Sequence, residues 1–426
     1  MVFVACRAAD LTNAFVGLWL VPKYVDPTEL GAVAPLTQYA NCLSLPAIIF
    51  ATTFRSELTS LAVAGRYGQM KTLMRGVFVA SAIFLALAIV ASRFILPLFL
   101  ERIRLVEGSL GVLILAVSFV SAVAPVYQNA MQSLKKFRDF SAMSVIGAPI
   151  RLLTMLVALP FRPIAGYFVG QASTPAFQIA SSVYFLRKEL RVKAEPYWGR
   201  SVVARFSMLF TMLAAGHAAG AVASLVESTV LRQRLPSIDS AGYYMVTRFS
   251  DIANYVAISL IFTLFPYAAE LHASGRGARS LVLKICAAII ASSAALAAFF
   301  WTFGERLLAL LPHGADYSAY WWAIPWAIGI AAASSMVSAH VTSEISANRF
   351  GYLKWMVPVC GAYAVALLAV TGHGHFAGIM PAAWSGFLAS HNVTSLQSMM
   401  WWITGFNLAK LAFCAAELLR AQKGKR

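Results

Sequence analysis

The fold class is decided by long apolar stretches, of which residues 76–100 are the clearest, GVFVASAIFLALAIVASRFILPLFL. A transmembrane helix needs about 20 mostly apolar residues to cross roughly 30 Å of hydrocarbon. Comparable stretches recur along the whole chain, among them 108–130, 280–304 and 352–371. The segments between them are too short for a soluble catalytic domain. The sequence therefore predicts an all-α, polytopic membrane protein.

The composition supports a membrane protein and argues against a nucleic-acid-binding one. The 426 residues are 60% hydrophobic and 12% charged, about half the charged fraction usual for soluble domains. The formal net charge of +17 would suggest a nucleic-acid partner in a soluble protein. Here the basic residues lie in short loops between apolar stretches, where they set membrane topology. We therefore predict no nucleic-acid partner.

No cofactor, metal or disulfide is predicted. His340 and Glu344 lie four residues apart, which superficially resembles metal-ligand spacing, but they straddle the end of one apolar stretch. The cysteines show no metal-ligand spacing and are expected to be small buried hydrophobic residues. All five fall within apolar stretches: Cys6, Cys42, Cys286, Cys360 and Cys414.

The apolar stretches and their polar breaks predict about twelve spans. The first lacks a basic leader, so we expect it to be a transmembrane helix rather than a removable signal peptide. The segment 372–395 has no assigned role. The predicted spans are 1–21, 31–54, 76–100, 108–130, 140–160, 163–186, 201–230, 242–267, 280–304, 319–341, 352–371 and 396–419.

The loop charges predict the orientation of the chain. Lysine and arginine favour the cytoplasmic side of a membrane. The loops after even-numbered spans, together with the basic residues at 420–426, carry roughly three times as many of them as the opposite loops. Both termini are therefore expected to face the cytoplasm.

An internal repeat relates the two halves. In residues 24–68 a turn ending in glycine (DPTELG, 26–31) precedes an apolar helix, which is followed by a glutamate and a Gly-Arg pair. Residues 235–277 show the same order, beginning with PSIDSAG at 236–242. Chance similarity between apolar helices is the alternative. Equivalent spans lie six apart, which predicts two lobes (1–190 and 201–426) related by a pseudo-twofold along the membrane normal, with a cytoplasmic linker at 191–200.

With these landmarks the chain resembles flippases of the polysaccharide biosynthesis family, within the multidrug, oligosaccharidyl-lipid and polysaccharide exporter superfamily. The resemblance is clearest over 21–68. It implies a V-shaped pair of helical lobes that moves a polyprenyl-pyrophosphate-linked oligosaccharide to the outer leaflet by alternating access. It also implies a bacterial inner-membrane location, a role in surface polysaccharides such as O-antigen of lipopolysaccharide, and other polysaccharide-assembly membrane proteins as partners. The N-terminus is shorter, and 372–395 longer, than the family pattern.

Two spans carry the same polar stripe of Arg, Asp and Asn at positions i, i+3 and i+6. Ionisable residues within a span cost roughly 3 kcal/mol each at mid-membrane, so each is a functional candidate. Residues three apart share a helix face, where the arginine and aspartate can pair. The stripes are Arg7, Asp10 and Asn13 in the first span and Arg248, Asp251 and Asn254 in the eighth.

The stripes suggest an anionic substrate. An arginine guanidinium presents a fixed fork of donors for an anionic head group, so we expect Arg7 and Arg248 to bind substrate together with the two asparagines. Asp10 and Asp251 are the candidates for ion coupling. Charge pairs that only orient two helices are the alternative.

Other intramembrane polar residues are further substrate-binding candidates: Arg151 in the fifth span, His217 in the seventh and Lys410 in the twelfth. His217 lies between Gly216 and Gly220, a spacing that allows close helix packing, so a hydrogen bond to a neighbouring helix is an alternative role. Glu227 lies near the end of its span and is expected at the membrane interface.

A membrane transporter, specifically a flippase, is the leading function. A cation-coupled multidrug exporter of the same fold is the first alternative, although acidic rather than basic cavity residues would suit cationic drugs. A membrane polysaccharide polymerase or ligase is the second. Such an enzyme needs a large external loop with arginine and histidine, and 372–395 contains histidines but no arginine.

Overall fold

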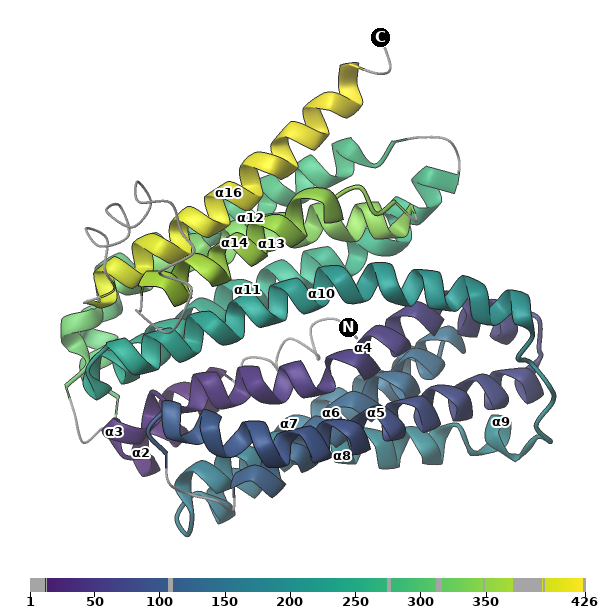
Figure 1. The fold of residues 1–426 in the computed structure, drawn as a ribbon, viewed down its shortest axis with the longest axis horizontal. Coiled ribbons are helices and arrows are strands. Elements are labelled where there is room, and N and C mark those ends of the chain that lie inside the picture. The colour runs from purple at the N-terminus through teal and green to yellow at the C-terminus, as the bar shows by residue number, and fades with distance from the viewer. Residues whose placement is uncertain are drawn as a thin grey trace. The chain divides into compact units, whose positions relative to one another are not determined.

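The computed structural model describes residues 12, 14–105, 110–273, 277–311, 316–347, 349–370, 393 and 395–423. Every regular element within those ranges is helical, as Figure 1 shows. The predicted all-α class is therefore confirmed. Nine of the described helices are long and apolar enough to cross a membrane by length and composition.

Eleven helices in these ranges have 18 or more residues. Two of them, α8 and α11, are not among the nine apolar ones, and both carry many polar side chains in their sequences. The eleven are α4 (Val33–Val63), α5 (Tyr67–Arg102), α6 (Leu110–Ser133), α7 (Phe137–Ala158), α8 (Pro163–Phe185), α10 (Arg200–Arg234), α11 (Ser237–Ala273), α12 (Arg279–Ala309), α13 (Ala323–Ser346), α14 (Leu353–Val370) and α16 (Leu396–Lys423).

Several helices extend well beyond the predicted spans. Helix α4 runs past Phe54 to Val63, and α5 begins at Tyr67 rather than at residue 76. Hydropathy detects only the part of a helix that crosses hydrocarbon, whereas backbone hydrogen bonding continues into the polar turns beyond it. The short turn between α4 and α5 uses Gly65 at φ +68°, a left-handed conformation that favours glycine.

The first predicted span lies largely outside the described residues. Its described end contains a π-helical turn, η1 (Val16–Leu20), and two short helices follow, α2 (Val21–Tyr24) and α3 (Pro27–Leu30). Asp26 caps α3, since its Oδ1 accepts from the Thr28 backbone N–H at 2.7 Å and from the Thr28 hydroxyl at 2.5 Å. These hydrogen bonds lower the pKa of the Asp26 carboxyl.

The described chain divides into two compact units. Among the described residues, the first comprises 12, 14–16 and 33–221, and the second comprises 17–32 together with 222–423. The division falls inside α10, between Ala221 and Val222. The short segment 17–32 therefore packs with the later half of the chain, although in sequence it lies between two parts of the first unit.

Both units use the same order of helix pairing. In the first unit α4 packs against α5 and α6, α6 packs against α8, and α7 packs against α8. In the second unit α11 packs against α12 and α13, α13 packs against α16, and α14 packs against α16. In Figure 1 each set forms a bundle of long neighbouring helices. The polar landmarks that repeat in the sequence thus accompany a repeated packing pattern.

The linker between the halves is held along the first unit. Its Glu195 backbone N–H donates to the Gly68 carbonyl at 3.2 Å, and its Glu195 carbonyl accepts from the Thr72 hydroxyl at 2.6 Å. The Trp198 ring lies so close to α5 that a Cβ on Gly76 would be 2.3 Å from it. These contacts explain why the linker belongs to the first compact unit.

Candidate substrate and ion site

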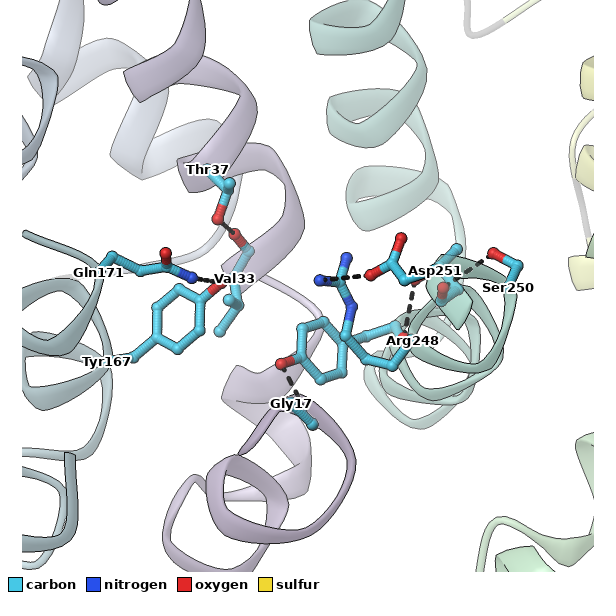
Figure 2. A network of polar contacts seen from close by, with 10 residues as sticks. Gly17, Val33, Thr37, Tyr167, Gln171, Arg248, Ser250 and Asp251 are labelled. Atoms are coloured by element: carbon cyan, nitrogen blue, oxygen red, sulfur yellow. Dashed lines mark hydrogen bonds and ion pairs between the residues drawn. The ribbon is translucent and has the colours of Figure 1, made fainter. Parts of the chain in front are cut away.

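The polar stripe of α11 forms one connected group. The Arg248 Nη1 lies 2.9 Å from the Asp251 Oδ2, and both side chains are about a quarter exposed, 29% and 23%. Figure 2 shows the Arg248 guanidinium directed at the Asp251 carboxylate. Asn254 donates to Asp251 and accepts from the Ser335 hydroxyl of α13 at 3.4 Å. The i, i+3, i+6 spacing therefore produces the predicted contact between arginine and aspartate.

The segment 17–32 supports Arg248. A Cβ on Gly17 would lie 2.8 Å from the Arg248 Cδ, so the absence of a side chain makes room for the arginine stem. The guanidinium lies 5.1 Å from the centre of the Tyr244 ring, within the range of a cation–π contact. The Tyr244 hydroxyl in turn donates to the Gly17 carbonyl at 3.4 Å. Arg248 is thus placed by its own helix and by a segment far away in sequence.

A second polar group surrounds Glu227 of α10. Its Oε2 accepts from the Tyr363 hydroxyl of α14 at 2.9 Å, and its Oε1 accepts from the Tyr243 hydroxyl of α11 at 3.3 Å. Glu227 is half-buried and Tyr363 is buried. Carboxylates inside a membrane protein need such partners, because unsatisfied polar groups are costly there.

Lys410 of α16 supplies a positive charge next to this carboxylate. It lies close enough to Glu227 for their charges to interact, and its Nζ lies 4.1 Å from the centre of the Phe406 ring. Phe406 stacks on Tyr363 with a centroid distance of 4.0 Å and an interplanar angle of 5°. The aromatic pair therefore orients both the lysine and one tyrosine donor.

Tyr243 connects the two groups. It donates to Glu227 and also lies within electrostatic range of Arg248 and Asp251. We refer to the combined set as the polar network, which consists of Glu227, Tyr243, Arg248, Asp251, Asn254, Tyr363 and Lys410. It lies entirely within the second unit and joins α10, α11, α14 and α16.

The charge balance of the polar network determines what it can do. Two cations, Arg248 and Lys410, face two carboxylates, Asp251 and Glu227, so the resting set is neutral. An anionic ligand must compete with a carboxylate for its cation. A proton or a metal cation on that carboxylate removes the competition and leaves the guanidinium fork or the ammonium ready for the ligand. Anion binding and cation uptake are therefore physically linked in this arrangement.

Two other predicted site residues lie outside this group. Arg151 is half-buried on α7 and His217 is exposed on α10, and both belong to the first unit. Arg7, Asp10 and Asn13 lie outside the described residues, so the predicted stripe of the first span stays a prediction. Of the predicted residues, the structure brings together Arg248, Asp251 and Asn254, with Lys410 in the same network.

Sequence reasoning undervalued Glu227 and missed Tyr243 and Tyr363. Nearness to the end of an apolar stretch suggested an interfacial glutamate, whereas α10 continues to Arg234 and two other helices supply donors. The high cost of placing a carboxylate inside a membrane could have identified Glu227 as a site residue. Tyrosine is too common in membrane proteins for its presence to have identified Tyr243 and Tyr363.

His340 pairs with a different residue from the one that its sequence spacing suggested. Its Nε2 lies 2.8 Å from the Glu417 Oε2 of α16, whereas the four-residue spacing had drawn attention to Glu344. His340 is 3% exposed. Within the described residues no group of three or more metal-ligating side chains is found.

Comparisons with known proteins agree with this fold. No family model matches the chain and no curated protein matches it in sequence. Among solved structures, an inward-facing multidrug resistance MATE family transporter of the MOP superfamily is similar with a TM-score of 0.67 and 10% identity, covering 99% of this chain and 98% of that one. A MOP superfamily transporter from Pyrococcus furiosus, described by the reverse polarity of its binding pocket, is similar with a TM-score of 0.66, 10% identity and coverage of 100% and 95%.

The lipid II flippase MurJ, in an inward closed conformation, is also similar, with a TM-score of 0.56 and 10% identity, covering 98% of this chain and 98% of that one. These likenesses show that the chain has the polytopic helical fold of MOP superfamily transporters. The predicted membrane-transporter fold is thus confirmed. The narrower polysaccharide flippase family is not shown by identities this low.

Proposed function

We propose that the protein is a membrane flippase that moves a polyprenyl-pyrophosphate-linked oligosaccharide from the cytoplasmic to the outer leaflet of a bacterial inner membrane. The observation that carries the proposal is the pair of intramembrane cations, Arg248 and Lys410, each next to a carboxylate in one network. A pyrophosphate offers the oxygens that a guanidinium fork and an ammonium bind. The fold shared with a lipid II flippase supports the same substrate class.

The polar network suggests a mechanism for loading and release. Arg248 binds a phosphate while Asp251 holds a proton or a cation, and loss of that proton or cation restores the pair and displaces the substrate. Asn254 keeps Asp251 in place. Asp10, Arg7 and Asn13 in the first span, with Arg151 and His217, would extend the binding surface in the first lobe. Two lobes related by the sequence repeat would alternate access to the two leaflets.

A cation-coupled multidrug exporter is the second candidate. The multidrug transporter has the higher TM-score, 0.67 against 0.56 for the lipid II flippase. Glu227 and Asp251 are carboxylates of the kind that attract cationic drugs, but each already has a cationic neighbour within the network. The polymerase or ligase alternative has no support from these neighbours, whose names describe transporters and a flippase.

Arg248→Ala tests the proposed function. In proteoliposomes that contain a fluorescent polyprenyl-pyrophosphate glycan, we expect the substitution to abolish flipping, and Arg248→Lys to restore it only partly because an ammonium lacks the planar fork. Arg306→Ala removes an exposed arginine of the same unit and serves as the matched control. Full flipping by Arg248→Ala at normal expression, or efflux of organic cations without any flipping, would overturn the proposal.

The orientation is tested independently. The loop charges predict that a reporter fused after Arg426 lies in the cytoplasm. A phosphatase reporter that is active only outside the cytoplasm should therefore stay inactive there. An active reporter would contradict the proposed direction of transport, because the lobes would then be inverted.

A further inference from the structure

The C-terminal end of α5 carries a groove that the polar network does not use. The groove has a volume of about 430 Å³ and a mainly apolar lining. Beside it the helix exposes Phe94, Ile95 and Leu98, each by more than half of its surface. The groove therefore lies next to an apolar exposed face. Its lining residues are Ser92, Arg93, Leu96, Pro97, Leu100, Glu101 and Leu105.

Arg93 is an unusual residue for this position. It lies nine residues before the end of α5, about 14 Å at 1.5 Å per residue, and within the apolar stretch 76–100. Its side chain is exposed, and within the described part of the chain no hydrogen bond or ion pair is found for its guanidinium. An arginine at such a depth normally reaches the head-group level and pairs with an external anion, because burying it in hydrocarbon is costly.

The groove pairs this positive charge with a negative one. Glu101 lies two helical turns after Arg93 on the same ridge of α5, roughly 12 Å away along the axis. The arginine side chain can cover about half of that distance by extending toward the helix end. Between them, Pro97 has no N–H to donate to the Arg93 carbonyl, which leaves an additional acceptor at this level.

The charges and the apolar floor match one class of ligand. We propose that the groove binds a membrane phospholipid with a primary-amine head group, as in phosphatidylethanolamine. Its phosphate pairs with Arg93, its ammonium donates to Glu101, the head group lies against Leu96 and Leu100, and one acyl chain runs toward the middle of the membrane over the exposed Phe94 and Val90. A quaternary choline head group cannot donate to Glu101, and an anionic glycerol head group would bring no cation to it. This site concerns the bilayer lipid and does not depend on the transported substrate.

Lipid-dependent thermal stability tests the site. The purified full chain in detergent is melted with added phosphatidylethanolamine, phosphatidylcholine or phosphatidylglycerol. We expect phosphatidylethanolamine to raise the Tm most, and Arg93→Gln or Glu101→Gln to weaken its apparent affinity about tenfold, the loss of one charge-assisted hydrogen bond. Arg102→Gln, an exposed neighbour outside the groove, is the matched control and should change nothing. Equal protection by the three lipids, or an unchanged response of Arg93→Gln, would overturn the proposal.

A second measurement covers variants that fold poorly. A photoactivatable phosphatidylethanolamine is crosslinked to the wild-type protein in nanodiscs, and the labelled peptides are mapped by mass spectrometry. The groove predicts labelling concentrated between residues 92 and 105 that an excess of unlabelled phosphatidylethanolamine, but not phosphatidylcholine, suppresses. Labelling spread evenly over the exposed helices would mean ordinary annular lipid and would contradict a specific site.

Discussion

Helices α4 and α11 occupy equivalent positions in the two units but carry different chemistry. Each packs against the next two long helices of its unit. Between Val33 and Ala51, helix α4 receives hydrogen bonds from neutral groups: the Ser118 hydroxyl donates to the Ala40 carbonyl at 3.1 Å, and the Asn129 amide donates to the Ala51 carbonyl at 2.9 Å. Helix α11 instead carries the ion pair of Arg248 and Asp251 at 2.9 Å.

Packing and polar function are therefore separable in this fold. Neutral side chains that bond to backbone carbonyls satisfy both partners and respond little to protons or ions. Ion pairs inside a membrane are sensitive to protons and ions, because removing or neutralising one member leaves the charge of the other uncompensated. Among the described residues, the second unit therefore has the clearer means to couple substrate and ion binding.

Removing one charge from the polar network should have the largest effect. Lys410→Met leaves Glu227 without its nearby cation. We expect loss of transport and a destabilisation of about 2 kcal/mol, discounted from the value for a fully buried pair because both side chains are half-buried. The double variant Glu227→Gln with Lys410→Met should recover stability but not transport. Thermal unfolding and flipping are the two measurements.

The matching change in the first unit is the control for this comparison. Asn129→Ala removes a neutral hydrogen bond to α4 and should cost about 1 kcal/mol of stability while transport continues. If Asn129→Ala stops transport as completely as Lys410→Met does at equal expression, the neutral hydrogen bonds of the first unit are as important for transport as the charges of the second.

Gly31 and Gly242, the glycines of the repeated motif, should give an intermediate effect. A Cβ on Gly31 would lie 2.3 Å from the Ser240 Oγ and 3.0 Å from the Ser240 carbonyl carbon. A Cβ on Gly242 would lie 2.7 Å from the Tyr320 ring. We expect either alanine substitution to lower stability by about 1–3 kcal/mol through overpacking, measured by thermal unfolding.

Gly405→Ala is the matched substitution, because nothing lies within 4 Å of its Cβ position. It should be neutral or slightly stabilising, as alanine is a better helix former than glycine. Ser240→Gly should rescue Gly31→Ala but not Gly242→Ala. If Gly31→Ala is as harmless as Gly405→Ala, the close approach of the two motif segments is not needed for stability.

The smallest effect concerns pH at the cap of α3. Hydrogen bonds from Thr28 lower the pKa of Asp26 below its ordinary value of 3.8, so the ionised carboxylate stabilises the folded state. That stability is present above the unfolded-state pKa and is lost as the pH falls through the lower folded-state pKa. Thr28→Val should flatten this dependence below about pH 4, as seen in the unfolding temperature.

Asp26→Asn is the control, since an amide cannot titrate and should remove the same acid-side slope. The effect is small because Asp26 is exposed. A wild-type slope that persists unchanged in both variants would assign the acid sensitivity to other carboxylates.

Sequence periodicity and loop composition predicted much of the fold. The apolar stretches located the long helices, and the glycine and acidic landmarks related α4 to α11 before their packing was known. The stripe of Arg248, Asp251 and Asn254 was found because residues three apart share a helix face. The grouping of segment 17–32 with the second unit left no trace in composition or periodicity, since it depends on contacts between residues more than 200 positions apart.

That these segments are membrane helices follows from their composition, because hydrocarbon admits only long apolar segments whose backbone groups bond within the helix. Which polar groups meet depends on how the helices pack against one another. Glu227 accepts hydrogen bonds from Tyr243 and Tyr363, which lie on two other helices. Arg248 fits beside Gly17 because glycine has no side chain there. Such partners are set by the packing of helix faces, which no local pattern along one helix encodes.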